Sequence, residues 1–470
     1  MSVTSFRDPD GFVLIDEGAV YRVVHEATAS ELLSFLGTGP GRALLATGKF
    51  IESCVARPEE SAGVLAKVQD RVEGWSDASV LRHEAISFPT FPYEWSRGML
   101  REAGRATLDV AQQLLAAGYG LKDATPYNVL FRGPKPVIVD ALSVEKRQPG
   151  DAVWRPLAQF LQTFLYPLQL DAWQGRPVHE TLRGRREGVR VEEMFAWLDW
   201  ANRIRPDGLR WTSIPHWLEG GSSETAAEPG KKHEPEFASH LVGGMLRRLD
   251  RALEAIPVAE SETDWSDYST ACHYEQESRQ QKRAFVQDVL ARLEPGQVLD
   301  LGCNDGEYSR LAAQRHAVVS ADFDPVAVDR LWRQAHAEEL AICPMVLNIA
   351  QPTPAVGWRN RENPSFIERA AGQFDCVLML ALLHHLTVTE RVPTTMVLEL
   401  AADLTKSVAV IEWVSPQDPM YKKLLRGRDA LHLGDTREAF EQACQARFAI
   451  RQRRSLQEGR RWIYELEKRA

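Results

Sequence analysis

The sequence has few cysteines and no long apolar run. Its six cysteines are scattered through the 470 residues, and none forms a C-x-x-C pair. This spacing argues against a structural zinc site and against a disulfide framework. No stretch reaches the ~18 uninterrupted apolar residues of a membrane-spanning helix, and the opening MSVTSFRDPDGF lacks the features of a signal peptide. We therefore expect a cytoplasmic protein with no structural metal and no membrane partner.

An excess of basic charge is also missing. The chain has 56 Lys and Arg against 65 Asp and Glu, which gives a net charge of -9 at pH 7. The basic footprint of a nucleic-acid-binding protein is therefore absent, and no nucleic-acid partner is expected. Hydrophobic residues make up 44% of the chain and charged residues 26%, as in ordinary globular proteins. The length predicts two or three domains of about 100–200 residues each.

One segment has the composition of a linker. Residues 220–236, GGSSETAAEPGKKHEPE, are rich in Gly, Ser, Pro and charge and have no apolar periodicity. The following segment, Phe237–Ile256, repeats leucines at helical spacing and predicts a connecting helix. We therefore expect an N-terminal domain over 1–215, a linker and connecting helix over 216–260, and a C-terminal domain over 261–470.

The C-terminal part alternates apolar strands with amphipathic helices. The predicted strands are 296–303, 317–323, 344–348, 374–381 and 407–414, and the predicted helices are 307–315, 325–339, 389–404 and 437–447. Two further strands, 448–456 and 460–468, meet around the turn QEGR as an antiparallel hairpin. The pattern predicts an α/β domain with a seven-stranded Rossmann-like sheet that ends in an antiparallel hairpin.

The strongest motif is the glycine turn in VLDLGCNDGEYSRLAA. A buried strand ends at Asp300, and the turn 302–306 leads directly into a helix. Glycine permits the tight turn and lets a ligand lie against the backbone, while Asn304 tolerates left-handed geometry. The N-terminus of the following helix favours a carboxylate. Asp322 ends the next strand about 20 residues later, where an acidic side chain accepts hydrogen bonds from ribose hydroxyls.

That spacing alone would fit NAD equally well. The turn reads D-x-G-x-x-x-G, however, and lacks the G-x-G-x-x-G of dinucleotide-binding proteins. A plain dehydrogenase sheet would also continue with parallel strands rather than a hairpin. With these motifs, the region of roughly 200 residues resembles class I S-adenosylmethionine-dependent methyltransferases. The alternative is a nucleotide-free α/β domain with a chance glycine turn.

The resemblance implies S-adenosylmethionine as the cofactor. The turn would line its methionine part, Asp322 would hold the ribose, and Asn348 would contact the adenine amino group. Leu380 and Ala381, at the end of the fourth strand, would border the sulfonium. The full set of implied cofactor-binding residues is Asp300, Gly302, Cys303, Asn304, Gly306, Asp322, Phe323, Asn348, Leu380 and Ala381.

Candidate catalytic residues follow the fourth strand. His384 and His385 in ALLHHL lie beyond the carboxyl end of a strand, where ligands bind in open α/β sheets. Either histidine can take a proton from an acceptor near neutral pH, although one could instead orient the loop while the other faces solvent. Glu412, at the end of the fifth strand, and Trp358, in the long polar stretch 351–373, are candidate acceptor-binding residues. Glu412 could equally be a loop-edge carboxylate, and the stretch around Trp358 a mobile surface excursion.

The N-terminal part contains a second, weaker pattern. In LKDATPYNVLFRGPKPVIVDALS, Asp123, Asn128 and Asp140 have the D-x-x-x-x-N…D arrangement of a kinase catalytic region. In phosphoryl transfer the first Asp takes the hydroxyl proton, and the Asn and the last Asp hold magnesium. A predicted helix over Arg97–Leu115 precedes this motif trio. The segment thus resembles protein-kinase-like folds, particularly small-molecule phosphotransferases.

The departures from that pattern are substantial. The first Asp follows Gly-Leu-Lys rather than a His-Arg or His-Gly pair, and the last is followed by Ala-Leu. No glycine-rich phosphate loop is visible in 11–24, which predicts a simple hairpin. We expect a degenerate kinase-like α+β domain that binds substrate or acts as a scaffold. The alternative is a small α+β domain in which Asp123 starts a turn and Asn128 caps it.

The whole chain resembles bacterial methyltransferases related to a rhizobial nodulation host-specificity family. The phrases FPYEWSRGML and GLKDATPYNVLF carry this resemblance, which implies a small-molecule or glycan-like acceptor. The sequence therefore predicts methyl transfer to an oxygen, nitrogen or carbon nucleophile. A bifunctional kinase–methyltransferase and a non-catalytic cofactor-binding protein are the two alternatives.

Overall fold

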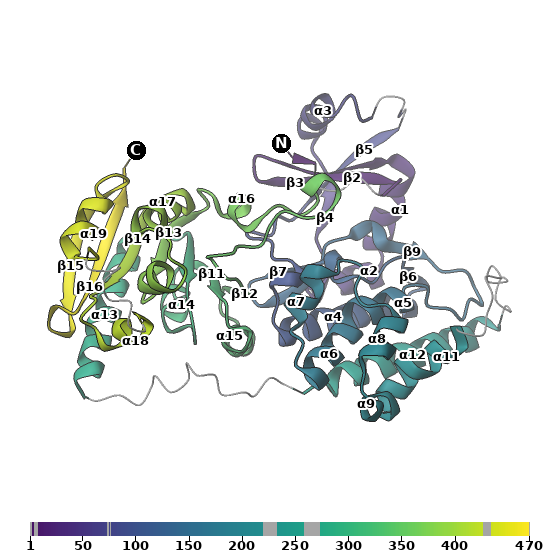
Figure 1. Ribbon diagram of the computed structural model, residues 1–470. Coiled ribbons are helices and arrows are strands. Elements are labelled where there is room, and N and C mark those ends of the chain that lie inside the picture. Colours follow the sequence, from purple (N-terminus) through teal and green to yellow (C-terminus); the bar gives the residue numbers. More distant parts are fainter. Residues whose placement is uncertain are drawn as a thin grey trace. The chain divides into compact units, whose positions relative to one another are not determined.

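The computed structural model divides the chain into two compact units. It describes residues 2–3, 8–72, 75, 77–219, 233–257, 273–425 and 434–469 (Figure 1). Unit 1 comprises Met1–Ala259 and Gly357–Asn363, and unit 2 comprises Glu260–Val356 and Pro364–Ala470. The predicted linker at 220–236 lies largely outside the described residues.

Unit 1 begins with an antiparallel sheet in the order β1-β2-β3-β5-β4. Its strands are β1 (Ser2–Val3), β2 (Gly11–Asp16), β3 (Ala19–His25), β5 (Ala78–His83) and β4 (Ser53–Val55). The hairpin predicted for 11–24 is formed by β2 and β3. Leu14, Val23 and Val80 belong to one apolar face of the sheet, and this face packs against Val64 of helix α3. The helices of this part are α1 (Glu26–Leu36), α2 (Gly39–Ala46) and α3 (Pro58–Lys67).

The rest of unit 1 is mostly helical. Helix α4 (Arg97–Ala116) begins where Ser96 Oγ accepts a hydrogen bond from the Met99 N–H. Helix α12 (Pro235–Glu254) contacts α4, and its leucines at 246, 249 and 253 are buried. The predicted connecting helix is therefore part of the core of unit 1. The helices between them are α5 (Leu157–Phe160), α6 (Tyr166–Gln174), α7 (Val178–Gly184), α8 (Val191–Trp197), α9 (Trp200–Ile204), α10 (Pro206–Gly208) and α11 (Ile214–Glu219).

Two small antiparallel ladders carry the motif trio of unit 1. Strand β6 (Tyr119–Leu121) pairs with β9 (Val144–Lys146), and β7 (Val129–Arg132) pairs with β8 (Lys135–Ile138). Asp123 follows β6, Asn128 directly precedes β7, and Asp140 follows β8. The trio therefore comes from the ends of neighbouring short elements.

Unit 2 contains a mixed seven-stranded sheet in the order β12-β11-β10-β13-β14-β16-β15. Its strands are β10 (Gln297–Leu301), β11 (Ala317–Asp322), β12 (Ile342–Val346), β13 (Phe374–Met379), β14 (Thr405–Val414), β15 (Phe448–Leu456) and β16 (Arg461–Lys468). The first five are parallel, and β16 runs antiparallel to both β14 and β15. This is the predicted sheet with its C-terminal hairpin, which ends the sheet on one side (Figure 1).

Helices cover both faces of this sheet. Phe285 of α13 and Leu331 of α15 join strand residues such as Val298 in one core. On the other face, Phe440 of α19 packs against Tyr464, and α19 contacts α17. The helices of unit 2 are α13 (His273–Arg292), α14 (Glu307–Ala312), α15 (Pro325–Ala337), α16 (Phe366–Ala370), α17 (Thr394–Leu404), α18 (Pro419–Leu425) and α19 (Arg437–Cys444).

Several predicted boundaries in unit 2 differ from the structure: for example, β13 ends at Met379 rather than at residue 381, β14 begins at Thr405 rather than at 407, and α14 ends at Ala312 rather than at 315. The helix expected to start at residue 389 begins at Thr394, directly after Pro393, and 385–389 form a separate π-helical turn. Proline has no backbone N–H to donate, so it is not tolerated inside a helix. A helix starting at residue 389 would have Pro393 in its interior. Strand β12 begins at Ile342, two residues earlier than expected, because Ile342 and Cys343 extend its buried run. Among the described residues, no helix has both the length and the apolar character to cross a membrane.

Candidate active site

The turn after β10 has left-handed backbone at three residues. The φ angles are 73° at Gly302, 46° at Asn304 and 76° at Gly306. Glycine adopts such angles without strain, and asparagine tolerates them better than most residues. The N–H groups of Gly302 and Cys303 donate to the carbonyl oxygen of Ala321 at 2.9 and 3.2 Å. These bonds tie the turn to the end of β11.

The two glycines of the turn meet different surroundings. A Cβ on Gly306 would lie 2.3 Å from Cδ1 of Leu331, so this glycine permits close packing against α15. A Cβ on Gly302 would lie 3.4 Å from Cδ1 of Leu382, which is nearly ordinary contact. Gly302 is therefore required mainly for its backbone angle, and Gly306 for both angle and space.

Asp322 holds the turn from the neighbouring strand. Its Oδ2 accepts a hydrogen bond of 2.8 Å from the N–H of Asn304, and its Oδ1 accepts one of 2.9 Å from the N–H of Asp324. Burial raises the pKa of the Asp322 carboxyl, and the backbone donors oppose that rise. A carboxylate has about four acceptor sites, so Asp322 keeps acceptor capacity for a ribose hydroxyl beyond its backbone donors.

Asp300 lies beside this turn in a buried hydroxyl network. Its side chain is 2% exposed, and Oδ2 accepts a bond of 2.6 Å from the Ser309 hydroxyl. Ser320 donates in turn to Ser309 at 2.8 Å. Burial raises the pKa of Asp300 to about 6, and the hydrogen bond from Ser309 opposes this shift. The sequence analysis missed both serines, since no local pattern shows that a helix and a strand residue meet.

Phe323, expected near the ribose, and Asn348, expected near the adenine, follow two adjacent strands. Phe323 comes directly after β11, and its side chain is 58% exposed. Asn348 follows β12, and its Oδ1 accepts a hydrogen bond of 3.0 Å from the N–H of Ala350. The Leu347 N–H donates to the Asp322 carbonyl oxygen at 2.7 Å, which joins the two strand ends. Within the part of the chain that the structure describes, the amide nitrogen of Asn348 has no hydrogen-bond acceptor, and its side-chain oxygen keeps one lone pair.

The end of β13 carries unusual backbone. Leu380 is buried, and Ala381 has a φ of 54°, which is strained for a residue with a Cβ. Leu301 of β10 pairs with Met379 of β13, so the two strands end side by side. Strain of this kind concentrates at ligand-binding sites and costs about 1–3 kcal/mol. The strained residue therefore lies next to the glycine turn.

The two histidines differ in exposure. His384 is 4% exposed, and its ring lies 4.3 Å from that of His385 and 6.2 Å from that of Tyr421, measured between centroids. Burial lowers the pKa of His384 to about 3, and the neighbouring His385 adds to the shift. His385 is only half-buried, and its pKa is lowered by burial and by Arg461. Both rings are therefore uncharged at neutral pH, and His385 is the accessible one.

A buried ion-pair network lies at the ends of β14 and β16. Glu412 is 1% exposed and pairs with Nζ of Lys282 at 2.5 Å and Nη1 of Arg461 at 3.4 Å. Arg461 also donates to both carboxylate oxygens of Asp418, at 2.8 and 3.2 Å. Burial raises the pKa of Glu412, but the charges of Lys282 and Arg461 lower that pKa by more, so the net shift is downward. Glu412 is therefore already paired, and sequence reasoning did not identify Arg461.

Trp358 lies in a different part of the structure from the other candidates. It starts the short 3-10 turn Trp358–Asn360, and its side chain is 63% exposed. The segment 357–363 is grouped with unit 1, whereas Glu412 belongs to unit 2. The two tentative acceptor-binding residues are therefore not brought into one site within unit 2.

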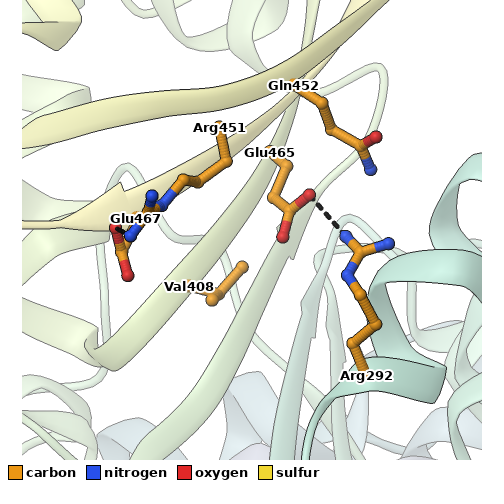
Figure 2. A pocket seen from close by; sticks show the side chains of 6 residues that line it. All are labelled: Arg292, Val408, Arg451, Gln452, Glu465 and Glu467. Atoms are coloured by element: carbon orange, nitrogen blue, oxygen red, sulfur yellow. Dashed lines mark hydrogen bonds and ion pairs between the residues drawn. The ribbon is translucent and has the colours of Figure 1, made fainter.

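Two cavities of unit 2 lie at opposite ends of β14. One, of about 490 Å³, is at the carboxyl end and is lined in part by Trp413, Gln417, Asp435 and Trp462. The other, of about 370 Å³, includes Val408 near the start of β14. Figure 2 shows this second cavity with the ion pair between Arg292 and Glu465, whose atoms are 2.6 Å apart. The first cavity lies at the carboxyl end of its strand, where ligands bind in open α/β sheets, but none of the candidate cofactor-binding or catalytic residues lines it.

Comparison with known proteins identifies the chemistry of unit 2. Residues 274–444 match the family model described as a methyltransferase domain. The chain carries an S-adenosylmethionine-dependent methyltransferase domain. Along its whole length, the methyltransferase is similar to nodulation protein NoeA of Rhizobium meliloti (strain 1021). The two are 28% identical over 468 residues, which cover 99% of this chain and 95% of that protein.

Solved structures similar to the methyltransferase include other methyltransferases. Magnesium protoporphyrin IX methyltransferase (ChlM) from Synechocystis PCC 6803 is 18% identical, with a TM-score of 0.31, over 43% of this chain and 89% of that chain. N-methyltransferase NodS from Bradyrhizobium japonicum WM9 is 12% identical, with a TM-score of 0.31, over 42% and 99%. The bifunctional kinase-methyltransferase WbdD is 20% identical, with a TM-score of 0.30, over 45% and 42%.

The residues of unit 2 fit S-adenosylmethionine. Left-handed backbone at Gly302 keeps side chains away from the turn, and Asp322 keeps acceptor capacity for ribose hydroxyls. Asp300 offers a buried carboxyl whose ionised form a cationic ammonium would favour. When bound, the cofactor supplies an electrophilic methyl group on its sulfonium.

Proposed function

We propose that the methyltransferase transfers its methyl group to an oxygen, nitrogen or carbon nucleophile of a small-molecule or glycan-like acceptor. The observation that carries this proposal is the hydrogen bond from the Asn304 N–H to Asp322, which joins the two cofactor-binding strand ends. His385 follows β13, the strand beside β10, and lies at the same carboxyl edge of the sheet. A cofactor held by the turn and Asp322 would therefore face an acceptor near His385.

In this proposal His385 receives the proton that an acceptor hydroxyl or amine loses. Its lowered pKa keeps the ring uncharged at neutral pH, and a neutral imidazole has one unprotonated nitrogen that can accept a proton. His384 is buried, with its ring centroid 4.3 Å from that of His385, and would pack the loop in place. Most of the rate would come from holding the nucleophile in line with the methyl group, as proximity and orientation require.

The cavity at the carboxyl end of β14 supports a polar acceptor. Its volume of about 490 Å³ is within the usual range for small-ligand pockets. Amide, carboxylate and hydroxyl side chains line it together with Trp413 and Trp462. Such a lining offers hydrogen bonds to hydroxyl groups and apolar contact to ring carbons. We further propose that unit 1 binds or presents the acceptor.

The proposal is tested by titration of the full chain with S-adenosylhomocysteine. Wild type is expected to bind at micromolar concentrations, and Asp322→Ala to lose this binding, since it removes the ribose acceptor and the anchor of the turn. Asp288→Ala, on the exposed side of α13, is the matched control and should bind as wild type. Folded wild type that does not bind would overturn the cofactor site.

Acceptors are then sought by following S-adenosylhomocysteine release with panels of hydroxylated, amine-bearing and saccharide compounds. Turnover with one class would assign the acceptor. Binding of the cofactor without turnover on any class would favour the non-catalytic alternative. The bifunctional alternative rests on the motif trio of unit 1, which would require magnesium-dependent nucleotide binding.

A further inference from the structure

Two members of the motif trio of unit 1, Asn128 and Asp140, meet in space. The side-chain amide of Asn128 donates to Oδ2 of Asp140 at 3.4 Å, and the Val139 N–H donates to the Asn128 carbonyl oxygen at 2.9 Å. Asp123 accepts a hydrogen bond of 3.4 Å from Gln159. In a phosphotransferase with this motif, the Asn and the last Asp together hold a magnesium ion. The question is whether these two side chains are available to a metal here.

A guanidinium group already occupies the Asp140 carboxylate. Arg22, in the middle of β3, donates from Nη1 to Oδ1 of Asp140 at 2.8 Å. The Arg22 side chain is 8% exposed and that of Asp140 is 24% exposed. With Asn128 on the other oxygen, both oxygens of Asp140 have a donor.

The other groups near Arg22 do not offer it an alternative partner. His83 on the adjacent strand β5 is buried, and burial followed by the charge of Arg22 lowers its pKa to about 3. The Ser53 hydroxyl is hydrogen-bonded to Nδ1 of that ring at 2.8 Å. A neutral histidine cannot pair with a guanidinium as a carboxylate does. Asp140 is therefore the counter-ion of Arg22, and an unpaired buried guanidinium would be costly.

Arg22 competes with magnesium for the Asp140 carboxylate. Mg²⁺ needs oxygen ligands at about 2.0–2.1 Å in near-octahedral geometry, whereas Arg22 holds one carboxylate oxygen as a hydrogen-bond acceptor. Asn128 presents its N–H rather than its oxygen to Asp140. Among the described residues, no group of three or more His, Cys, Asp or Glu side chains is arranged to hold a metal ion. The residues of the trio therefore do not fit the magnesium ion that their motif implies.

We propose that Arg22 is the resident cation of this centre, and that unit 1 takes no divalent cation at Asp140 while Arg22 is present. Its single fixed charge replaces the metal in balancing Asp140. Unit 1 then lacks magnesium-dependent phosphoryl transfer, and removal of the arginine exposes a latent divalent-cation site at Asn128 and Asp140. This inference concerns unit 1 alone and stands whether or not the proposed methyl acceptor is found.

The test uses Mn²⁺ as a spectroscopic substitute for Mg²⁺, with and without ATP, on the full chain. Wild type and Asp140→Asn are expected to bind Mn²⁺ equally, because the Asp140 carboxylate is closed to metal. Arg22→Met, which keeps the apolar stem, is expected to gain a site that the double variant Arg22→Met/Asp140→Asn lacks. Arg82→Met removes an arginine from the exposed ion pair with Glu60 and should gain nothing.

Either of two results would overturn the proposal. One is Mn²⁺ or magnesium–ATP binding by wild type that Asp140→Asn abolishes. The other is an Arg22→Met variant that is folded by circular dichroism and yet binds no more Mn²⁺ than Asp140→Asn. If Arg22→Met does not fold, Arg22→Lys is used instead, since it keeps a cation at the site. The comparison of Mn²⁺ binding between wild type and Asp140→Asn then still tests the proposal.

Discussion

The backbone N–H of Asn304 donates a hydrogen bond of 2.8 Å to Oδ2 of Asp322. The bond joins the glycine turn after β10 to the last residue of β11. A change at either residue therefore reaches both the methionine side and the ribose side of the proposed cofactor site.

The first prediction concerns the left-handed backbone of Asn304. Asn304→Gly keeps the N–H and permits the φ of 46°, so S-adenosylhomocysteine affinity should stay near the wild-type value. Asn304→Val places a β-branched residue in left-handed geometry, which costs about 1–2 kcal/mol and should weaken binding roughly tenfold. Isothermal titration measures both. Equal affinities in the two variants would show that the backbone angle does not control the site.

Gly306 should tolerate no side chain. In Gly306→Ala the new Cβ meets Leu331 at 2.3 Å and the backbone has a φ of 76°, so a loss of about 2–4 kcal/mol in unfolding free energy is expected. Gly372→Ala is the matched control, because Gly372 has a φ of 60° and no atom near its Cβ position. Urea denaturation should give a clearly smaller loss for the control. Similar losses would mean that steric contact with Leu331 is unimportant.

Asp300 should make cofactor binding depend on pH. Its pKa is raised to about 6 by burial, so the carboxyl is protonated below that pH and charged above it. The charged form attracts the cationic ammonium of the cofactor, so affinity should rise with pH from 5 to 7 and then level off, with proton release on binding near pH 6. Asp300→Asn should bind more weakly and lose this dependence. Titration in buffers of different ionisation enthalpy checks it, and an unchanged pH slope in the variant would refute it.

His385 should matter for turnover more than for cofactor binding. His385→Gln is expected to lower kcat about 10²-fold once an acceptor is known, since it removes the proposed base. S-adenosylhomocysteine affinity should be unchanged. Because the pKa of His385 is lowered, the acid limb of the wild-type kcat profile should lie below the ordinary histidine value of 6.5. A variant with full activity would leave positioning of the acceptor as the whole of catalysis.

The ion pair between Lys282 and Glu412 should stabilise unit 2. Lys282→Met leaves the buried carboxylate with one cation fewer and is expected to cost roughly 3 kcal/mol. The double variant Lys282→Met/Glu412→Gln should recover part of that loss. Lys406→Met breaks a half-exposed pair with Asp375 and should cost less than about 1 kcal/mol. If the double variant is no more stable than Lys282→Met, burial of an unpaired charge is not the cause.

Local patterns in the sequence predicted most of the sheet of unit 2. Strand β13 is an almost continuous apolar run, and the hairpin β15–β16 follows from two strands around a short turn. The left-handed geometry of Asn304 also follows from residue type. These features depend on neighbours in the chain, so composition and periodicity are enough.

Contacts between distant residues were not predictable. Arg22 and Asp140 are 118 residues apart, and Arg461 lies 49 residues from Glu412. Neither arginine belongs to a recognisable motif, because each acts through a partner that only the fold brings close. The amphipathic pattern of α12 predicted a helix but not its packing against α4, since periodicity shows which face is apolar and not what covers it.

The strand order of unit 2 has a consequence during synthesis. Strand β16 lies between β14 and β15, yet it is the last of the seven strands in the chain. Translation proceeds from the N-terminus, so β14 keeps an open edge until residues 461–468 emerge from the ribosome. Asp418 likewise lacks its ion-pair partner Arg461 until that residue has been synthesised. The nascent unit is therefore most prone to pair with another chain in the interval before its final hairpin is made.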